Sequence, residues 1–186
     1  SVFTGREPDE SRWNFDAPKF DSYSARFSYN PTRNWALQAS YGRLKSPEQL
    51  HPDIDTDRYT ASASYNHHLE KGNWQTTLAW GRNSNRPGPT LDAILLESEV
   101  EFHPHTFFGR AEWLEKNELF PEGHPFENNI FDVGKISLGY IHDFNIYQLL
   151  KFGVGGLVSA HFVPDDLEPV YGHIPVSYMI FIRAKL

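Results

Sequence analysis

The sequence predicts an all-β fold, an antiparallel up-and-down transmembrane β-barrel with about ten strands visible. Three observations predict it: apolar and polar residues alternate along most of the chain, long and short connections alternate between these segments, and aromatic pairs recur six residues apart. The composition agrees, because 15% of the residues are aromatic and the chain holds 13 Gly and 13 Pro, which favour strands and turns. We therefore treat residues 1–186 as one barrel domain, either complete in itself or part of a larger barrel.

Composition excludes several other classes of protein. No run of about 18 apolar residues is present, which excludes a transmembrane helix. The mean hydropathy of -0.54 still fits a barrel, since only every second residue of a barrel strand has to be apolar. The net charge of -7 argues against a nucleic-acid partner, and a chain without cysteine has no disulfide and no zinc–thiolate site. The chain opens without the basic segment of a signal peptide, so we expect that such a segment has been removed or that the gene product is longer.

Alternation with a period of two residues places nine strands in order along the chain. They cover residues 20–30, 34–44, 58–68, 73–83, 91–102, 106–116, 131–143, 149–162 and 176–186. Residues 1–6 look like the end of a tenth strand whose beginning is missing. No segment of useful length has the period of a helix.

The connections between these strands alternate in length. Long ones are expected at 7–19, 45–57, 84–90, 117–130 and 163–175. Short ones are expected at 31–33, 70–72, 103–105 and near 145–147. Bacterial membrane barrels have this rhythm, with short periplasmic turns and longer extracellular loops. The short turns and the C-terminus then share the periplasmic side.

Five of the segments carry two aromatic residues six positions apart, which places both rings on one face. Small or aliphatic residues lie between them on that face. Six residues of a tilted strand cover roughly 15 Å of the membrane normal, somewhat less than the usual apolar band of about 25 Å. We expect two belts of membrane-interface aromatics. The belt nearer the long loops contains Tyr23, Tyr41, Tyr59, Trp80 and Trp113, and the belt nearer the short turns contains Tyr29, Trp35, Tyr65, Trp74 and Phe107, with Phe102 beside it.

A soluble β-sandwich or lipocalin-like barrel that serves as a binding module is the alternative, because a buried core face produces the same alternation. Such a core does not require aromatic residues at both ends of each strand with small residues between them. The aromatic spacing therefore favours the membrane.

The face opposite the aromatic belts carries charged residues. An Arg or Lys that faces lipid costs about 2–4 kcal/mol at the membrane midplane, so we expect these residues to line the lumen. They are Arg26, Glu97, Glu99, Glu101, Arg110, Glu112, Lys135, His161, Arg183 and Lys185. They either line a water-filled pore and tune its ion selectivity, or they pair across a narrow lumen and close it, with Glu97, Glu99 and Glu101 against Arg110 and Lys135 on nearby strands. A solvated network of salt bridges with no specific ligand is the simpler interpretation.

Arg43 and Arg82 lie two residues beyond aromatic residues of the upper belt, on the same face. Because arginine forms bidentate contacts with phosphate, both are candidates for contact with lipopolysaccharide, with a solvated charge at a strand end as the alternative. The long loops are acidic and rich in proline. Their carboxylates suit divalent cations, but no loop matches an ordered calcium motif, so a solvated acidic surface is favoured.

Two histidine groups, His67–His68 and 103–105, are expected in short turns. Clustered imidazoles are typical ligands of copper or zinc, but neighbouring residues of a strand point to opposite faces, so we expect no metal site and no cofactor. A surface enzyme or a metal-binding barrel is an alternative that requires loop residues such as Asp53, His124 and Asp165. No catalytic motif with a G-x-S-x-G or H-E-x-x-H pattern is present, so we expect no enzyme.

Val176, Tyr178, Ile180, Ile182, Ala184 and Leu186 alternate up to the last residue. This segment resembles the terminal signal that the barrel-assembly machinery reads in Gram-negative outer-membrane proteins, with Leu186 where that pattern usually has Phe. Residues 3–10, 34–38 with Tyr41–Gly42, and 169–172 with 175–177 resemble a family of uncharacterised, porin-like outer-membrane proteins. The resemblance covers nearly the whole chain, and members of the family extend further upstream.

The resemblance implies a location in the bacterial outer membrane and no catalytic residues. We expect a passive porin-like channel or a structural component of that membrane. Its expected partners are outer-membrane lipid, lipopolysaccharide and, during biogenesis, the barrel-assembly machinery. A homo-oligomer or a larger membrane complex is compatible with the sequence.

Overall fold

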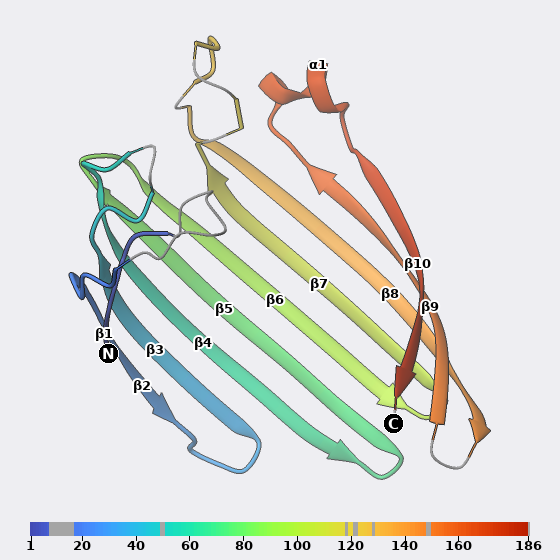
Figure 1. Cartoon of the computed structure of the whole chain (residues 1–186). Helices are drawn as coiled ribbons and strands as arrows, with labels where there is room; N and C mark the ends of the chain where they lie inside the picture. Colours follow the sequence, from blue (N-terminus) through green and yellow to red (C-terminus); the bar gives the residue numbers. More distant parts are fainter. Residues whose placement is uncertain are drawn as a thin grey trace.

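The computed structural model describes residues 1–7, 17–48, 51–117, 119–120, 123–127, 129–147 and 150–185. These residues form one antiparallel sheet of ten strands, which lie side by side in the order in which they occur in the chain (Figure 1). The strands are β1 (Val2–Phe3), β2 (Ser22–Tyr29), β3 (Trp35–Leu44), β4 (Asp55–Leu69), β5 (Gly72–Arg86), β6 (Thr90–Phe102), β7 (His105–Lys116), β8 (Phe131–Tyr147), β9 (Leu150–Phe162) and β10 (Val176–Lys185). The 3-10 turn η1 (Asp165–Leu167) and the short helix α1 (Glu168–Tyr171) lie between β9 and β10. Neither helical segment of this described part is long and apolar enough to cross a membrane.

Every pair of neighbouring strands keeps a regular register over most of its length. The β4–β5 pair, for example, runs without interruption from Asp55 opposite Arg86 to Leu69 opposite Gly72. The β8–β9 pair has an irregularity between Asn145 and Tyr147. The sheet is curved, and β1 and β10 stand at its two free edges (Figure 1). The predicted up-and-down order is therefore confirmed, and the sheet is open.

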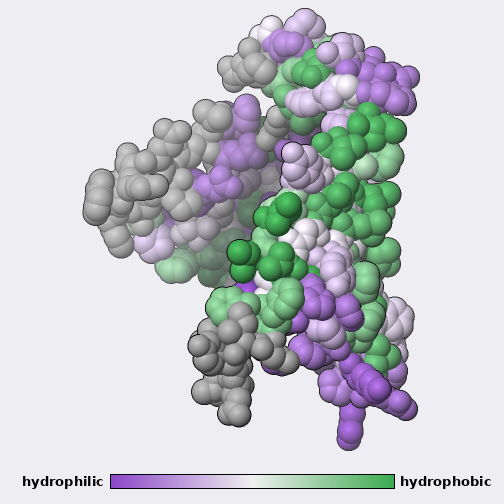
Figure 2. Space-filling view, turned by 90° about the vertical axis from the view of Figure 1, so that its right-hand side faces the viewer, coloured by the Kyte–Doolittle hydropathy of each residue, from purple (hydrophilic) through white to green (hydrophobic). Residues whose placement is uncertain are grey.

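The register carries the alternation of each strand into two continuous faces. Tyr29 lies opposite Leu37, Leu37 opposite Ala63, and Ala63 opposite Leu78, all on one face. The apolar side chains of this face are open to their surroundings: Leu138 is 68% exposed and Tyr178 is 83% exposed. On the side seen in Figure 2, hydrophobic residues form a band between hydrophilic residues at the two ends. We call this the apolar face, and the opposite one the polar face.

The buried core of the described residues is very small. Its buried hydrophobic side chains are Phe131, Ile141 and Leu167. A soluble β-sandwich buries its apolar face against a second sheet, whereas the strands described here belong to one sheet whose apolar face is exposed. The exposed apolar face therefore favours the barrel over the sandwich.

Two glycines of β8 and β9 allow aromatic rings to pack directly on the backbone of the polar face near β10. A Cβ atom on Gly139 would lie 2.1 Å from the ring of Phe108, which therefore packs directly on the backbone of β8. A Cβ on Gly155 would lie 2.7 Å from the ring of Phe181, which comes from β10. The rings of Phe108 and Phe181 lie 6.4 Å apart, although β8 and β9 separate their strands. These close approaches explain how β10 curls over its neighbours in Figure 1.

Several predicted boundaries were wrong. The connection expected at 84–90 is short, because β5 continues to Arg86 and β6 begins at Thr90, with a turn of two prolines around Gly88. Residues 145–147 belong to β8 and not to a turn, and His67 and His68 lie inside β4. Of the tenth strand expected at residues 1–6, Val2–Phe3 are in β1. The acidic residues 8–10, Glu122 and the terminal Leu186 lie outside the described residues.

Candidate channel wall

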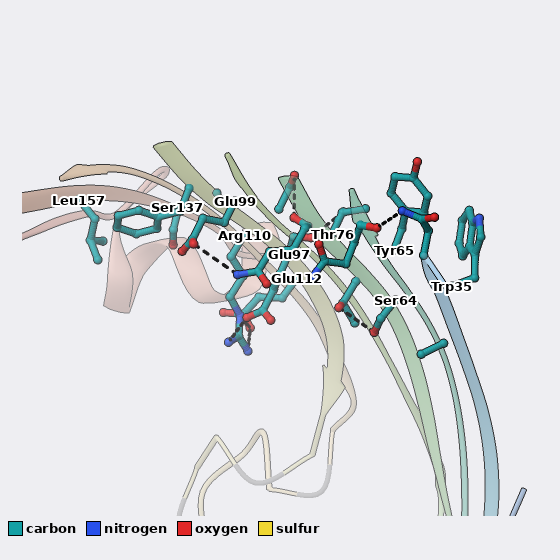
Figure 3. A pocket seen from close by; sticks show the side chains of 18 of the residues that line it. Trp35, Ser64, Tyr65, Thr76, Glu97, Glu99, Arg110, Glu112, Ser137 and Leu157 are labelled. Carbon is teal, nitrogen blue, oxygen red and sulfur yellow. Dashed lines mark hydrogen bonds and ion pairs between the residues drawn. The ribbon is translucent and has the colours of Figure 1, made fainter. Parts of the chain in front are cut away.

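All ten charged or titratable residues predicted for the lumen lie on the polar face. The register shows this directly, since Glu97 lies opposite Arg110, and Arg110 lies opposite Ser137. A hollow of about 980 Å³ runs along this face towards the β2–β3 turn, and its lining includes Ser64, Glu97, Glu99, Arg110, Lys135 and Ser137. Figure 3 shows Arg110 and Glu112 pointing into the inside of the curve.

A chain of ion pairs crosses three strands in this hollow. The Arg110 guanidinium lies 2.9 Å from a carboxylate oxygen of Glu97 in β6 and 2.9 Å from one of Glu112 in β7. The Nζ atom of Lys135 in β8 lies 3.8 Å from the other oxygen of Glu112. Arg110 and Glu97 are about half exposed, so solvent screens the pair strongly. The predicted pairing of Glu97 with Arg110 is present, whereas Lys135 contacts Glu112.

Glu99 differs from its neighbours on β6. It accepts a hydrogen bond of 3.3 Å from the side-chain amide of Gln75, and no ion pair of Glu99 occurs among the described residues. Glu101, two residues along, lies 3.7 Å from Nζ of Lys185. Of the three carboxylates on the polar face of β6, Glu99 therefore keeps the least compensated charge.

Arg183 is held by a second, more buried contact. Its guanidinium donates hydrogen bonds of 2.7 and 3.1 Å to both oxygens of Asp143, and a third of 3.2 Å to the hydroxyl of Thr106. Asp143 and Thr106 are almost fully buried. A Cβ on Gly153 would lie 2.4 Å from an oxygen of Asp143, so the arginine reaches β8 across a glycine of β9. The contact ties β10 to β7 and β8.

The remaining predicted lumen residues have different surroundings. Arg26 is exposed and, in the described part of the chain, has no carboxylate within ion-pair distance. His161 is half-buried, with Nδ1 3.1 Å from the backbone carbonyl of Pro175. Arg58 and Asp143, which were not among the predicted lumen residues, also lie on this face. The alternation of residues along β4 and β8 was the signal that could have predicted both. Arg58 donates a hydrogen bond of 2.9 Å to Asn83.

Uncharged hydroxyl groups pair between strands on the same face. Ser40 lies 2.6 Å from Thr60, Ser64 lies 2.9 Å from Thr77, and Ser137 lies 2.7 Å from Ser159, each measured between hydroxyl oxygens. Such groups interact well with water and with neutral polar solutes. The polar face therefore offers both charge and neutral hydrogen-bonding groups.

The ten predicted interface aromatics lie on the apolar face, and the structure brings most of them into contact. In the upper belt the ring centroids of Tyr23 and Tyr41 lie 6.2 Å apart, and those of Tyr41 and Tyr59 lie 5.1 Å apart. The indole of Trp80 in this belt donates a hydrogen bond of 3.0 Å to Asp92. Trp113 of β7 stands two strands beyond Trp80, opposite Ile94 of β6.

The lower belt also forms a nearly continuous row. Trp35 contacts Tyr65 at a centroid distance of 4.9 Å, and Tyr65 contacts Trp74 at 5.4 Å. Phe107 lies 5.7 Å from Phe102 and 5.0 Å from Tyr140, an aromatic residue that the pair spacing did not reveal.

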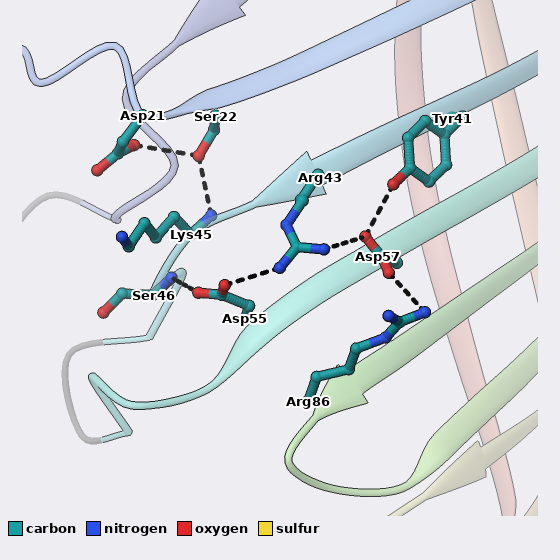
Figure 4. Close-up of polar contacts among 9 residues, drawn as sticks. All are labelled: Asp21, Ser22, Tyr41, Arg43, Lys45, Ser46, Asp55, Asp57 and Arg86. Carbon is teal, nitrogen blue, oxygen red and sulfur yellow. Dashed lines mark hydrogen bonds and ion pairs between the residues drawn. The ribbon is translucent and has the colours of Figure 1, made fainter.

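Arg43 and Arg82 project from the apolar face beyond the upper belt, and both are paired with carboxylates. Arg43 lies 3.1 Å from Asp55 and 3.7 Å from Asp57 (Figure 4). Asp57 is 3% exposed, lies 3.0 Å from Arg86 and accepts a hydrogen bond of 2.9 Å from the hydroxyl of Tyr41.

Arg82 makes a bidentate contact with Asp92 at 2.9 and 2.8 Å. A lipopolysaccharide phosphate that contacts Arg43 or Arg82 would therefore bind a guanidinium group that is already paired with a carboxylate.

The residues named for an enzyme lie in three separate connections. Asp53 follows β3, His124 follows β7, and Asp165 follows β9. The imidazole of His124 stacks on Phe120 and its Nδ1 accepts a hydrogen bond of 3.2 Å from the backbone of Phe126. Within the described ranges, no group of three His, Asp or Glu side chains is placed to hold a metal ion.

Comparison with known proteins gives similar folds and no similar sequences. No protein-family model and no curated relative matches the chain. The anion-selective porin of Comamonas acidovorans matches with a TM-score of 0.57 at 12% identity, over 88% of this chain and 48% of the porin. The Pseudomonas aeruginosa protein OpdO matches with a TM-score of 0.55 at 14% identity, over 100% of this chain and 60% of OpdO.

The fold of this chain is also similar to that of a receptor. The ferric enterobactin receptor of P. aeruginosa matches with a TM-score of 0.52 at 12% identity, over 87% of this chain and 30% of the receptor. The chain thus spans 48% and 60% of the two matched chains described above. It has the fold of a porin-type outer-membrane β-barrel, of which it forms an open part of ten antiparallel strands.

Proposed function

We propose that this chain forms part of the wall of a porin-like channel in a Gram-negative outer membrane. The observation that carries the proposal is the division of one sheet into two faces. The apolar face has two belts of aromatic rings, which suit the headgroup regions of a bilayer. The polar face has charged and hydroxyl groups, which require water.

The polar face is suited to a water-filled lumen. Its charges pair with neighbours on the same wall, as Arg110 does with Glu97 and Glu112, so the described ion pairs do not need an opposite wall. Glu99 and Arg26 remain available to passing ions. Small polar solutes and ions are the substrate class that such a wall favours, and the proposal includes no catalytic step.

Reconstitution of the full-length protein into a planar lipid bilayer tests this function. We expect discrete conductance steps that grow in proportion to the salt concentration, as a water-filled pore requires. A folded barrel, identified by heat-modifiable migration on a detergent gel, that inserts without conductance would contradict the channel.

A closed or plugged barrel is the second candidate. The similarity to the ferric enterobactin receptor favours it, since the same wall fold occurs in a receptor. The conductance measurement separates the two, because a plugged barrel inserts into the bilayer without steady current.

Lipopolysaccharide contact at Arg43 and Arg82 remains a prediction. Because both arginines are ion-paired, we expect only a modest loss of retained lipopolysaccharide in Arg43→Ala and Arg82→Ala. Quantifying the lipid that co-purifies with each variant tests this, and unchanged retention would contradict the contact.

A further inference from the structure

Histidines gather at the end of the sheet where the short turns lie. His67, His68, His103, His105 and His142 all belong to strand ends or turns at this end. His105 is the first residue of β7 and lies directly opposite His142 of β8. Both histidines belong to the apolar face. Their polar imidazoles are unusual there, because the surrounding side chains include the rings of Phe102, Phe107 and Phe144.

The two imidazoles converge on one oxygen atom. Nδ1 of His105 lies 2.7 Å from the hydroxyl oxygen of Tyr140, and Nδ1 of His142 lies 3.2 Å from the same oxygen. The two imidazole centroids are 5.2 Å apart with their planes at 60°. Three potential ligand atoms from two strands therefore lie close together.

We propose that His105, His142 and Tyr140 bind one divalent transition-metal ion, Zn²⁺ or Cu²⁺. Neutral imidazole is a preferred ligand of both metals. Ligand atoms about 2.0–2.1 Å from one ion are roughly 3 Å apart, which agrees with the two nitrogen–oxygen distances. The ion is bound by both Nδ1 atoms and the Tyr140 oxygen, and the phenol proton is released to water.

The surroundings suit this ligand set. The rings of Phe102 and Phe144 pack against the histidines at centroid distances of 5.7 and 4.6 Å and hold them in place. Tyr140 is 37% exposed and lies in the lower belt, at the headgroup level, where water is present to complete the coordination. The carboxylate nearest in sequence, Asp143, is on the opposite face and is engaged by Arg183. Tyrosine therefore supplies the third ligand. This site lies outside the lumen and is independent of channel function.

The test is a copper titration of the untagged, full-length protein in detergent. The protein is first treated with a chelator, which is then removed. We expect about one equivalent of Cu²⁺ to bind, with an electron paramagnetic resonance spectrum that shows coupling to two nitrogen atoms. Because a site of this kind binds Cu²⁺ more tightly than Zn²⁺, Zn²⁺ should displace the copper only in large excess. His105→Ala and His142→Ala each remove a ligand and should weaken binding by at least roughly 10- to 100-fold, the effect that loss of an outer-shell partner already has. Tyr140→Phe should weaken it by at least about 10-fold.

His67→Ala is the matched control. His67 lies on the same face at the same end of the sheet and stacks on Tyr65 at 6.1 Å, but it is not part of the cluster. Its variant should bind copper as the wild type does. Heat-modifiable migration verifies that each variant is folded, and Tyr140→Phe keeps the aromatic ring that an alanine would remove. Absence of bound copper, or equal affinity in the wild type and His105→Ala, would overturn the proposal.

Discussion

Asp57 connects strands β3, β4 and β5 at the end of the sheet where the long loops lie. It is 3% exposed and contacts Arg43, Arg86 and the hydroxyl of Tyr41. A buried carboxylate is stable only when its oxygens are satisfied in this way. If the carboxylate is lost, Arg86 loses its ion pair and Arg43 keeps only its pair with Asp55.

Asp57→Asn should therefore lower the temperature at which the barrel unfolds by several degrees. The amide removes the negative charge that two guanidinium groups share. Heat-modifiable migration over a temperature series measures the midpoint. Asp53→Asn, at an exposed residue of the connection that precedes β4, is the control and should leave the midpoint unchanged. Equal midpoints for the two variants would show that the network contributes no stability.

The pH dependence of the last long loop rests on His173. Its imidazole is hydrogen-bonded to the carboxylate of Glu168, which raises the pKa of His173 above its ordinary value of 6.5. Because the folded value is raised, the contact contributes fully below pH 6.5 and is lost as the pH rises through the higher folded value.

Glu168→Gln should return the pKa of His173 towards 6.5. A histidine NMR titration of the protein in micelles measures this, and His51, in another loop, serves as the internal reference. If the titration of His173 is the same in Glu168→Gln as in the wild type, the carboxylate is not the cause.

At the scale of the strands, glycines decide where the wall bends. Phe108 occupies the space that a side chain on Gly139 would need, and its ring contacts Phe181 of β10. An aromatic ring over a strand glycine shields the exposed backbone and fixes the register. The curl of β10 therefore depends on the glycine at position 139 of β8, which has no side chain to displace the ring of Phe108.

Gly139→Ala should destabilise the barrel by about 1–3 kcal/mol, because the ring of Phe108 has to leave its position. Urea unfolding in lipid vesicles, followed by tryptophan fluorescence, measures the change. Gly81→Ala is the control, since its Cβ would meet only a carbonyl oxygen at 3.9 Å. A loss no larger than that of the control would contradict the packing argument.

The sequence predicted the strands and their faces well, because period-2 alternation needs no knowledge of the neighbouring strands. It predicted partners less well, because these depend on register. Lys135 contacts Glu112 and not a carboxylate of β6. His105 and His142 meet only because the connection after β7 sets the β7–β8 register. The length of the connection around Gly88 was overestimated, because the polar residues at the end of β5 resemble a loop in sequence.

At the scale of the whole molecule, the charge on the polar face should set ion selectivity. Glu99→Gln removes a carboxylate that lacks an ion pair, so the reversal potential in a salt gradient should shift towards anions. Asp132→Asn removes a charge at the apolar face, opposite Glu115, and is the charge-matched control. Equal reversal potentials in Glu99→Gln and the wild type would show that Glu99 does not face the ion path.

The central claim is that one face of the sheet contacts lipid and the other contacts water. Because the chain has no cysteine, single cysteines at Ala61, Ser62, Ala63 and Ser64 of β4 can be spin-labelled one at a time in the reconstituted protein. We predict that labels at 62 and 64 are relaxed by a water-soluble nickel reagent, and that labels at 61 and 63 are relaxed by oxygen dissolved in the lipid. Four labels with equal access to the nickel reagent would contradict the account.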